Sequence, residues 1–110
     1  MSVDFEIPPA AAQSLLAEGR ARLIDVREEF EYAAARLEGA ELIPMGTVPA
    51  QLQRLEAAAD GELLIVYCHH GVRSLNVVAW LRRQGVDNCT SLAGGIDRWS
   101  VEIDPQVPRY

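Results

Sequence analysis

The chain has 110 residues, 49% of them hydrophobic, and a formal net charge of −6. This length supports one compact domain spanning residues 1–110, and the composition is that of a globular core rather than of a disordered chain. The acidic balance argues against nucleic acid as a partner, because phosphate backbones bind basic surfaces. For one small acidic domain we expect a monomer.

Neither a membrane span nor an export signal is predicted. No apolar run approaches the roughly 20 residues that crossing a bilayer requires. The acidic start, residues 1–6, lacks the basic and apolar regions of a secretory signal. We therefore expect a cytoplasmic location, where the cysteines Cys68 and Cys89 would stay reduced.

Short apolar runs alternate with amphipathic segments along the chain. The first half predicts a helix over 10–18, a strand over 21–26, a helix over 27–35, a strand over 41–43 and a helix over 48–58. The second half predicts a strand over 63–67, a helix over 74–84, a strand over 88–92, a short helix from Gly94 to Trp99 and an irregular tail over 103–110. This alternation indicates an α/β fold, with a small, mostly parallel sheet of about four to five strands flanked by helices on both faces.

A cysteine directly follows the most apolar of these strands. Cys68 ends the run 63–67, the loop after it reaches Arg73, and a helical pattern opens at Ser74. In parallel sheets the active crevice lies outside the carboxyl ends of the strands, and a helix N-terminus stabilises anions. We therefore interpret Cys68 as a nucleophile rather than as a buried core cysteine. Cys89, at a strand start, is interpreted as a core residue.

The loop after Cys68 is interpreted as an anion cradle. If it curls around the sulfur, its N–H groups and the helix dipole favour the thiolate. Gly71 suits a turn with positive φ, and Arg73 offers a fixed charge and a planar donor fork. For the two histidines, contact with a bound anion and simple exposure both stay open. The candidate binding residues are His69, His70, Gly71, Val72, Arg73 and Ser74.

Other polar residues follow the ends of neighbouring strands. Asp25 and Arg27 are candidates for a supporting role at the same edge of the sheet. Arg27 and Glu31, spaced i, i+4, are predicted to form a local ion pair. Neither a metal site nor a cofactor is predicted, because the neighbours Cys68, His69 and His70 rarely converge on one ion and no second ligand cluster exists.

Four stretches in order resemble the rhodanese family of sulfurtransferases, as a single stand-alone domain. They are Ile24–Arg27 with Glu31-Tyr32, Leu37–Ala40 with Ile43-Pro44, Tyr67–Ser74, and Leu92–Ile96 with Trp99. The second stretch departs from the family pattern, because Arg36-Leu37 with Glu38 stands in place of the usual histidine-isoleucine. The resemblance runs from about Ile7 to Ser100, nearly the whole chain.

The resemblance implies a chemistry for Cys68. The thiolate would take the outer sulfur of a donor such as thiosulfate or a protein persulfide, carry it as a persulfide, and pass it to a thiol or cyanide. It also implies that Arg73 and the loop histidines meet the donor's oxygens and that Asp25 braces the loop. A cysteine desulfurase or a thioredoxin-like protein would be a fitting protein partner.

The composition of the loop bears on the donor. Family members that favour thiosulfate often place basic residues where His69 and His70 stand. We therefore expect thiosulfate to be a poor donor and a protein persulfide to be a better one.

Two other functions fit parts of the same pattern. A rhodanese-like domain can act as a persulfide carrier without turnover, or as an interaction module. A dual-specificity-like phosphatase uses a similar cysteine–arginine loop, but with one residue more than the loop from Cys68 to Arg73, so the spacing favours sulfur over phosphate.

Overall fold

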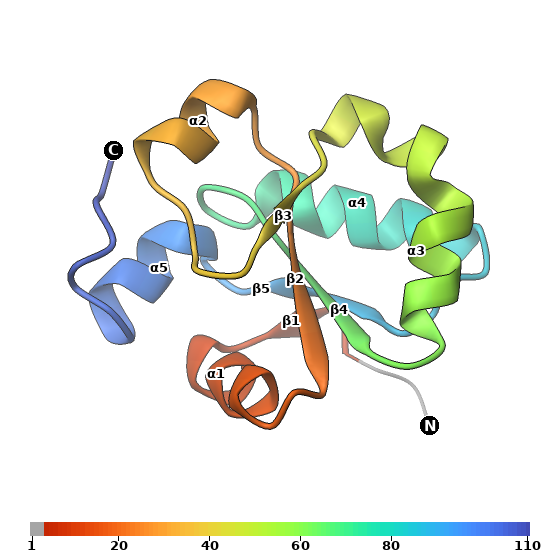
Figure 1. Cartoon of the computed structure of the whole chain (residues 1–110), viewed down its shortest axis with the longest axis horizontal. Helices are drawn as coiled ribbons and strands as arrows, with labels where there is room; N and C mark the ends of the chain where they lie inside the picture. Colours follow the sequence, from red (N-terminus) through yellow and green to blue (C-terminus); the bar gives the residue numbers. More distant parts are fainter. Residues whose placement is uncertain (1–3) are drawn as a thin grey trace.

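A computed structural model describes residues 4–110, and residues 1–3 of the acidic start lie outside the described part. Its centre is a five-stranded sheet with the order β1-β5-β4-β2-β3, in which every paired strand is parallel (Figure 1). The strands are β1 (Glu6–Ile7), β2 (Ala21–Asp25), β3 (Glu41–Leu42), β4 (Leu63–Tyr67) and β5 (Cys89–Leu92). The predicted α/β fold with a small parallel sheet is confirmed.

Helices cover both faces of this sheet. Their bounds are α1 (Pro9–Ala17), α2 (Glu29–Ala34), the 3-10 helix η1 (Met45–Gln51), α3 (Leu52–Ala59), α4 (Val72–Arg83) and α5 (Gly95–Glu102). Helices α1 and α5 pack on one face, and α3 and α4 pack on the other (Figure 1). No helix within residues 4–110 has the length and hydrophobicity needed to cross a membrane.

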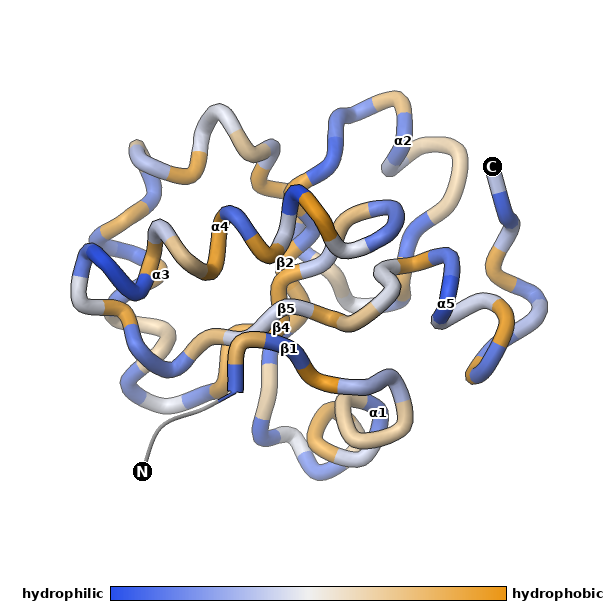
Figure 2. Tube along the Cα trace, turned by 180° about the vertical axis from the view of Figure 1, so that it is seen from behind, coloured by the Kyte–Doolittle hydropathy of each residue, from blue (hydrophilic) through white to orange (hydrophobic). Residues whose placement is uncertain are grey.

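The central strand β4 contributes to both cores. Leu64 and Val66 point into the cluster beneath α3 and α4, whereas Ile65 and Tyr67 point into the cluster beneath α1 and α5. Burial on both faces explains why this strand is apolar throughout. Along α4, in contrast, hydrophobic and hydrophilic residues alternate, as expected of a helix with one buried face (Figure 2).

Several elements differ from the sequence-based expectations, including α4, which begins at Val72 and not at Ser74, and α5, which continues to Glu102. Strand β1 was not predicted, because two residues paired with the edge of β5 leave no periodic signal. The segment predicted as a helix over 48–58 is the end of η1, which contains Pro49, followed by α3 from Leu52. Helix α2 begins only at Glu29, where Glu28 and Glu31 form a capping box, so Arg27 precedes the helix.

The carboxyl ends of the strands carry the loops that matter for function. The amide of Val26, after β2, donates to the carbonyl of Tyr67 at 3.1 Å. At the start of α5, the amides of Ile96 and Asp97 donate to the carbonyls of Cys68 and His69 at 2.9 and 3.1 Å. The loop after β4 is thus attached to the segment after β5 by main-chain hydrogen bonds.

This attachment requires a glycine at position 95. Gly95 has a φ of +61°, and a Cβ there would overlap the carbonyl oxygens of Cys68 and His69. Gly71, at φ +103°, is less tightly enclosed, because a Cβ there would stand 3.3 Å from the amide nitrogen of Gly94. A side chain at position 95 would push the cysteine loop away from α5.

We predict that Gly95→Ala destabilises the fold far more than Gly19→Ala. Gly19 has a similar φ of +69° but open space around its Cβ position, so alanine there adds only the left-handed backbone strain, on the order of 1 kcal/mol. At Gly95 the overlap adds a further cost of about 1–3 kcal/mol. Urea denaturation of both variants measures the difference, and equal losses of unfolding free energy would contradict the prediction.

Candidate active site

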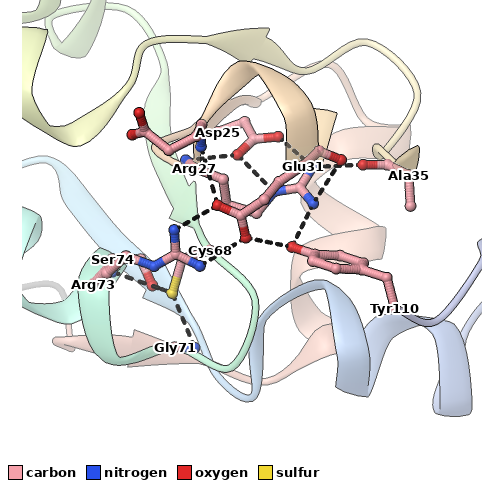
Figure 3. Close-up of polar contacts among 10 residues, drawn as sticks. Asp25, Arg27, Glu31, Ala35, Cys68, Gly71, Arg73, Ser74 and Tyr110 are labelled. Atoms are coloured by element: carbon pink, nitrogen blue, oxygen red, sulfur yellow. Dashed lines mark hydrogen bonds and ion pairs between the residues drawn. The ribbon is translucent and has the colours of Figure 1, made fainter. Parts of the chain in front are cut away.

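Cys68 lies between its own loop and the hydrophobic cluster beneath α3 and α4, of which it is a member, so it is buried like the core cysteine from which the sequence interpretation distinguished it. The side chain is only 1% exposed, and Sγ accepts hydrogen bonds from the amides of Gly71 at 3.1 Å and Ser74 at 3.4 Å (Figure 3). Both donors belong to the first turn of α4 or its cap, where the helix dipole adds positive potential. The predicted arrangement of inward-facing amides is therefore present, and it can stabilise negative charge on the sulfur.

A pair of hydroxyl groups lies next to the sulfur. Ser74 Oγ is 3.4 Å from Cys68 Sγ and 2.7 Å from Ser91 Oγ, and both serines are fully buried. Ser91 comes from β5 and was not singled out in the sequence, where a serine within an apolar strand gives only a weak signal. Whichever of the two hydroxyls donates, the hydrogen-bonded serines place polar atoms next to the sulfur.

Arg73 is held by a glutamate instead of facing an open crevice. Its guanidinium makes a two-point contact with the Glu31 carboxylate, at 2.7 and 2.9 Å, and Glu31 is 5% exposed. The predicted ion pair between Arg27 and Glu31 is wrong: the contact of Arg27 with Glu31 is to its backbone carbonyl, at 3.3 Å, and not to its carboxylate. The i, i+4 rule fails here because Arg27 lies before α2, outside the helical geometry that the rule assumes.

Arg27 pairs with Asp25, and both side chains are completely buried. Nε and Nη2 of Arg27 donate to the two carboxylate oxygens at 2.9 and 2.6 Å. Burial alone would lower the pKa of Arg27, but hydrogen bonds to Asp25 and Tyr110 outweigh it and raise that pKa, so the charge is permanent. Arg27 also donates to the carbonyl of Ala35 at 2.6 Å. The pair thus joins the end of β2 to the middle and the C-terminal cap of α2.

Tyr110 reaches this charged group from the far end of the sequence. Its hydroxyl donates to Glu31 Oε2 at 2.8 Å and accepts from Arg27 Nη1 at 2.7 Å (Figure 3). Its ring stacks on His69, with centroids 4.0 Å apart and planes inclined by 11°. Burial raises the pKa of Tyr110, so the hydroxyl remains a donor at neutral pH. No sequence signal pointed to this residue.

The remaining loop residues face outward to different degrees. His69 is partly covered, and burial, helped by the nearby His70, lowers the pKa of His69, which favours the neutral ring. The His70 side chain is 63% exposed and lies 3.8 Å from Asp97. Val72 is 71% exposed, so its side chain contributes nothing to the enclosure of the sulfur.

His69, His70 and Asp97 come close enough together to be considered as a metal site. Their ligand atoms lie within 4.8 Å of one another. However, the two imidazole rings stack with centroids 4.0 Å apart, so their in-plane lone pairs run side by side instead of converging. Asp97 is already held by Arg109, at 2.8 and 3.1 Å. This arrangement does not form a coordination sphere.

The Glu31 carboxylate gives the fold a measurable acid sensitivity. Hydrogen bonds from Arg73, opposed by burial, lower the pKa of Glu31 from 4.5 to about 2. A depressed folded-state pKa stabilises the fold at pH values above 4.5, and that stability is lost as the pH falls toward 2. We predict that Glu31→Gln lowers stability at neutral pH and flattens this acid-dependent loss.

Urea denaturation at pH 7 and at pH 3 measures the effect. The matched control is Glu56→Gln, which changes an exposed glutamate of α3 and should follow the wild-type dependence on pH. An identical pH dependence in Glu31→Gln and wild type would refute the assignment of the shift to Glu31.

Comparisons with known proteins agree with this fold. The Rhodanese-like domain model matches residues 8–102. The thiosulfate sulfurtransferase GlpE of Haemophilus influenzae is 37% identical over 94 residues, which cover 86% of each protein. The Rhodanese-like/PpiC domain-containing protein 12 of Arabidopsis thaliana is also 37% identical over 94 residues, 82% of this chain, but the match spans only 30% of that longer relative.

Solved structures show the same relationship in three dimensions. The human single-domain sulfurtransferase TSTD1 superposes with a TM-score of 0.79 at 31% identity, covering 91% of this chain and 98% of that one. A rhodanese-related protein from Thermoplasma volcanium gives a TM-score of 0.81 at 27% identity, covering 97% and 100%. With the family model extending over almost the whole chain and the cysteine loop in place, the protein belongs to the rhodanese-like domain family.

Proposed function

We propose that the protein is a sulfurtransferase that carries sulfane sulfur on Cys68. The observation on which the proposal rests is the pair of amide hydrogen bonds, from Gly71 and Ser74, to the sulfur at the start of α4. A thiolate held in this way is a nucleophile, and the same amides can hold the terminal sulfur of a persulfide. The relatives GlpE and TSTD1, both named as sulfurtransferases, support the proposal.

The proposed reaction has two half-reactions. The Cys68 thiolate attacks the outer sulfur of thiosulfate, a new S–S bond forms, and sulfite leaves with the electrons of the broken S–S bond. An acceptor thiolate, or cyanide, then attacks the terminal sulfur and regenerates the Cys68 thiolate, giving an acceptor persulfide or thiocyanate. The balance needs no external oxidant or reductant, and it predicts ping-pong kinetics.

The surroundings of Arg73 favour a protein persulfide as the better donor. Arg73, in the first turn of α4, is the arginine next to the cysteine loop, but its Nη1 and Nη2 both donate to Glu31. Thiosulfate must compete with this carboxylate for the guanidinium, whereas a persulfide carries less charge to be neutralised. A cysteine desulfurase or a thioredoxin-like protein is the proposed class of partner, with thiosulfate as a small-molecule substitute.

A second candidate, a carrier without turnover, is favoured by one observation. Cys68 is 1% exposed, so its sulfur would be well protected once loaded. Turnover distinguishes the two functions: an enzyme forms many equivalents of acceptor persulfide per Cys68, whereas a carrier delivers one.

Cys68→Ser should fold normally and lose all sulfur loading. After incubation with donor, mass spectrometry should find one added sulfur on the Cys68 peptide of the wild type and none in the variant. The matched control is Cys89→Ala, which removes the other thiol, buried in the core, and should still load. Sulfur on Cys89, or activity retained in Cys68→Ser, would contradict the assignment of the nucleophile.

Loading from a persulfidated cysteine desulfurase should exceed loading from thiosulfate. Because the guanidinium of Arg73 is engaged by Glu31, we expect a difference in second-order rate on the order of tenfold, the worth of one charge-assisted hydrogen bond. Quenched-flow measurement of Cys68 persulfide with each donor gives the ratio. A clear preference for thiosulfate would reject the protein-persulfide preference while leaving the sulfurtransferase assignment intact.

A further inference from the structure

The Glu31 carboxylate has more donors than Arg73 alone. Tyr110 donates its hydroxyl to Oε2 at 2.8 Å, and the amide of Glu28 donates to Oε1 at 3.1 Å. Arg73 uses the same two oxygens. The carboxylate is therefore shared between a cation of the active-site loop and two donors outside that loop.

This sharing matters when an anion enters the site. Nη1 and Nη2 of Arg73 both donate to Glu31, so an anionic donor that takes these two groups displaces the carboxylate from them. Glu31 is 5% exposed, so when its carboxylate loses its charged partner Arg73 it carries a large desolvation penalty unless other donors remain. The Tyr110 hydroxyl is such a donor, and its oxygen accepts from the permanently charged Arg27 at 2.7 Å, which strengthens the bond that it donates.

Tyr110 is held in place independently of Glu31. Its ring stacks on His69 at a centroid distance of 4.0 Å, and the preceding residue, Arg109, makes a two-point contact with Asp97 in α5. The hydroxyl can therefore keep its position when Arg73 moves.

We propose that Tyr110 is a positioning residue that sets the affinity of the site for anionic donors, because its hydroxyl retains the Glu31 carboxylate when Arg73 turns to the substrate. The inference rests on the proposed function in one respect, the identity of the natural anionic donor; the effect of Tyr110 on anion binding follows from the contacts of Glu31. Without the Tyr110 hydroxyl, Arg73 would be the remaining side-chain donor to Glu31 among the residues of the described structure. The ion pair between Arg73 and Glu31 would then be harder to separate. Anion binding then weakens, while the reactivity of the sulfur itself does not change.

Alkylation of Cys68 tests this without any sulfur transfer. The thiolate displaces iodide from the anionic reagent iodoacetate or from its neutral analogue iodoacetamide, and mass spectrometry of the Cys68 peptide gives both rates. In Tyr110→Phe, which retains a ring to stack on His69, we expect the iodoacetate-to-iodoacetamide ratio to fall on the order of tenfold, the effect of one hydrogen bond to a charged group. The KM for thiosulfate should rise by a similar factor with kcat unchanged.

The matched control is Tyr32→Phe. It removes a hydroxyl that donates to the Ala40 carbonyl at 3.3 Å, away from Glu31, and should keep the wild-type ratio. Tyr110→Leu, which also removes the stacked ring, should show at least the same fall as Tyr110→Phe.

Three results would be decisive. An unchanged ratio in Tyr110→Phe overturns the inference, as does a fall confined to Tyr110→Leu, which would assign the effect to the contact with His69. A fall in Tyr110→Phe supports the inference even if no persulfide forms on Cys68, in which case the sulfurtransferase proposal fails alone. Unfolding curves in urea confirm that each variant is folded.

Discussion

The hydrogen bonds from two main-chain amides to the buried sulfur of Cys68 depend on the path of the surrounding loop and helix. The amides of Gly71 and Ser74 can both reach Cys68 Sγ only because the loop turns sharply, at φ +103° for Gly71, and continues directly into α4. The amides at the start of α5 hold the outer side of the same loop through the carbonyls of Cys68 and His69. A parallel sheet makes this possible, because the loops after β4 and β5 leave it at the same edge.

A series of alternating charges leads away from the sulfur: Arg73, Glu31, Arg27 and Asp25, with the Tyr110 hydroxyl between Glu31 and Arg27 (Figure 3). Each buried charge has an opposite charge or a strong donor beside it, which is the condition for keeping such groups away from water. The arrangement also limits how freely Arg73 can respond to a substrate. An anion that binds Nη1 and Nη2 of Arg73 competes with the Glu31 carboxylate, so binding of an anion and rearrangement of Glu31 are coupled.

Features that depend on residues close together in the sequence were predicted, whereas contacts between distant residues were not. Strand β4 was predicted to the residue, because an uninterrupted apolar run bounded by polar residues has few other interpretations. The enclosure of Cys68 was predicted as well, since the sulfur and its donors lie within six positions of each other. The pairing of Arg73 with Glu31 was not predicted, because the two residues are 42 positions apart along the chain. The i, i+4 spacing instead favoured Arg27 as the partner of Glu31. Tyr110, 79 residues from Glu31, lies in an irregular tail whose path no local pattern specifies.

The sequence by itself determined the fold class, the nucleophile candidate and the loop that surrounds it, because hydrophobic periodicity, turn residues and contiguous motifs are local properties of the chain. Only the tertiary structure decided which charges pair, that β1 completes the sheet edge, and that Tyr110 lies against the active-site loop. These features depend on where distant segments meet, and one carboxylate can satisfy any cation that folding brings within reach. The geometry of the folded chain therefore selects Arg73 for Glu31 and leaves Arg27 to Asp25.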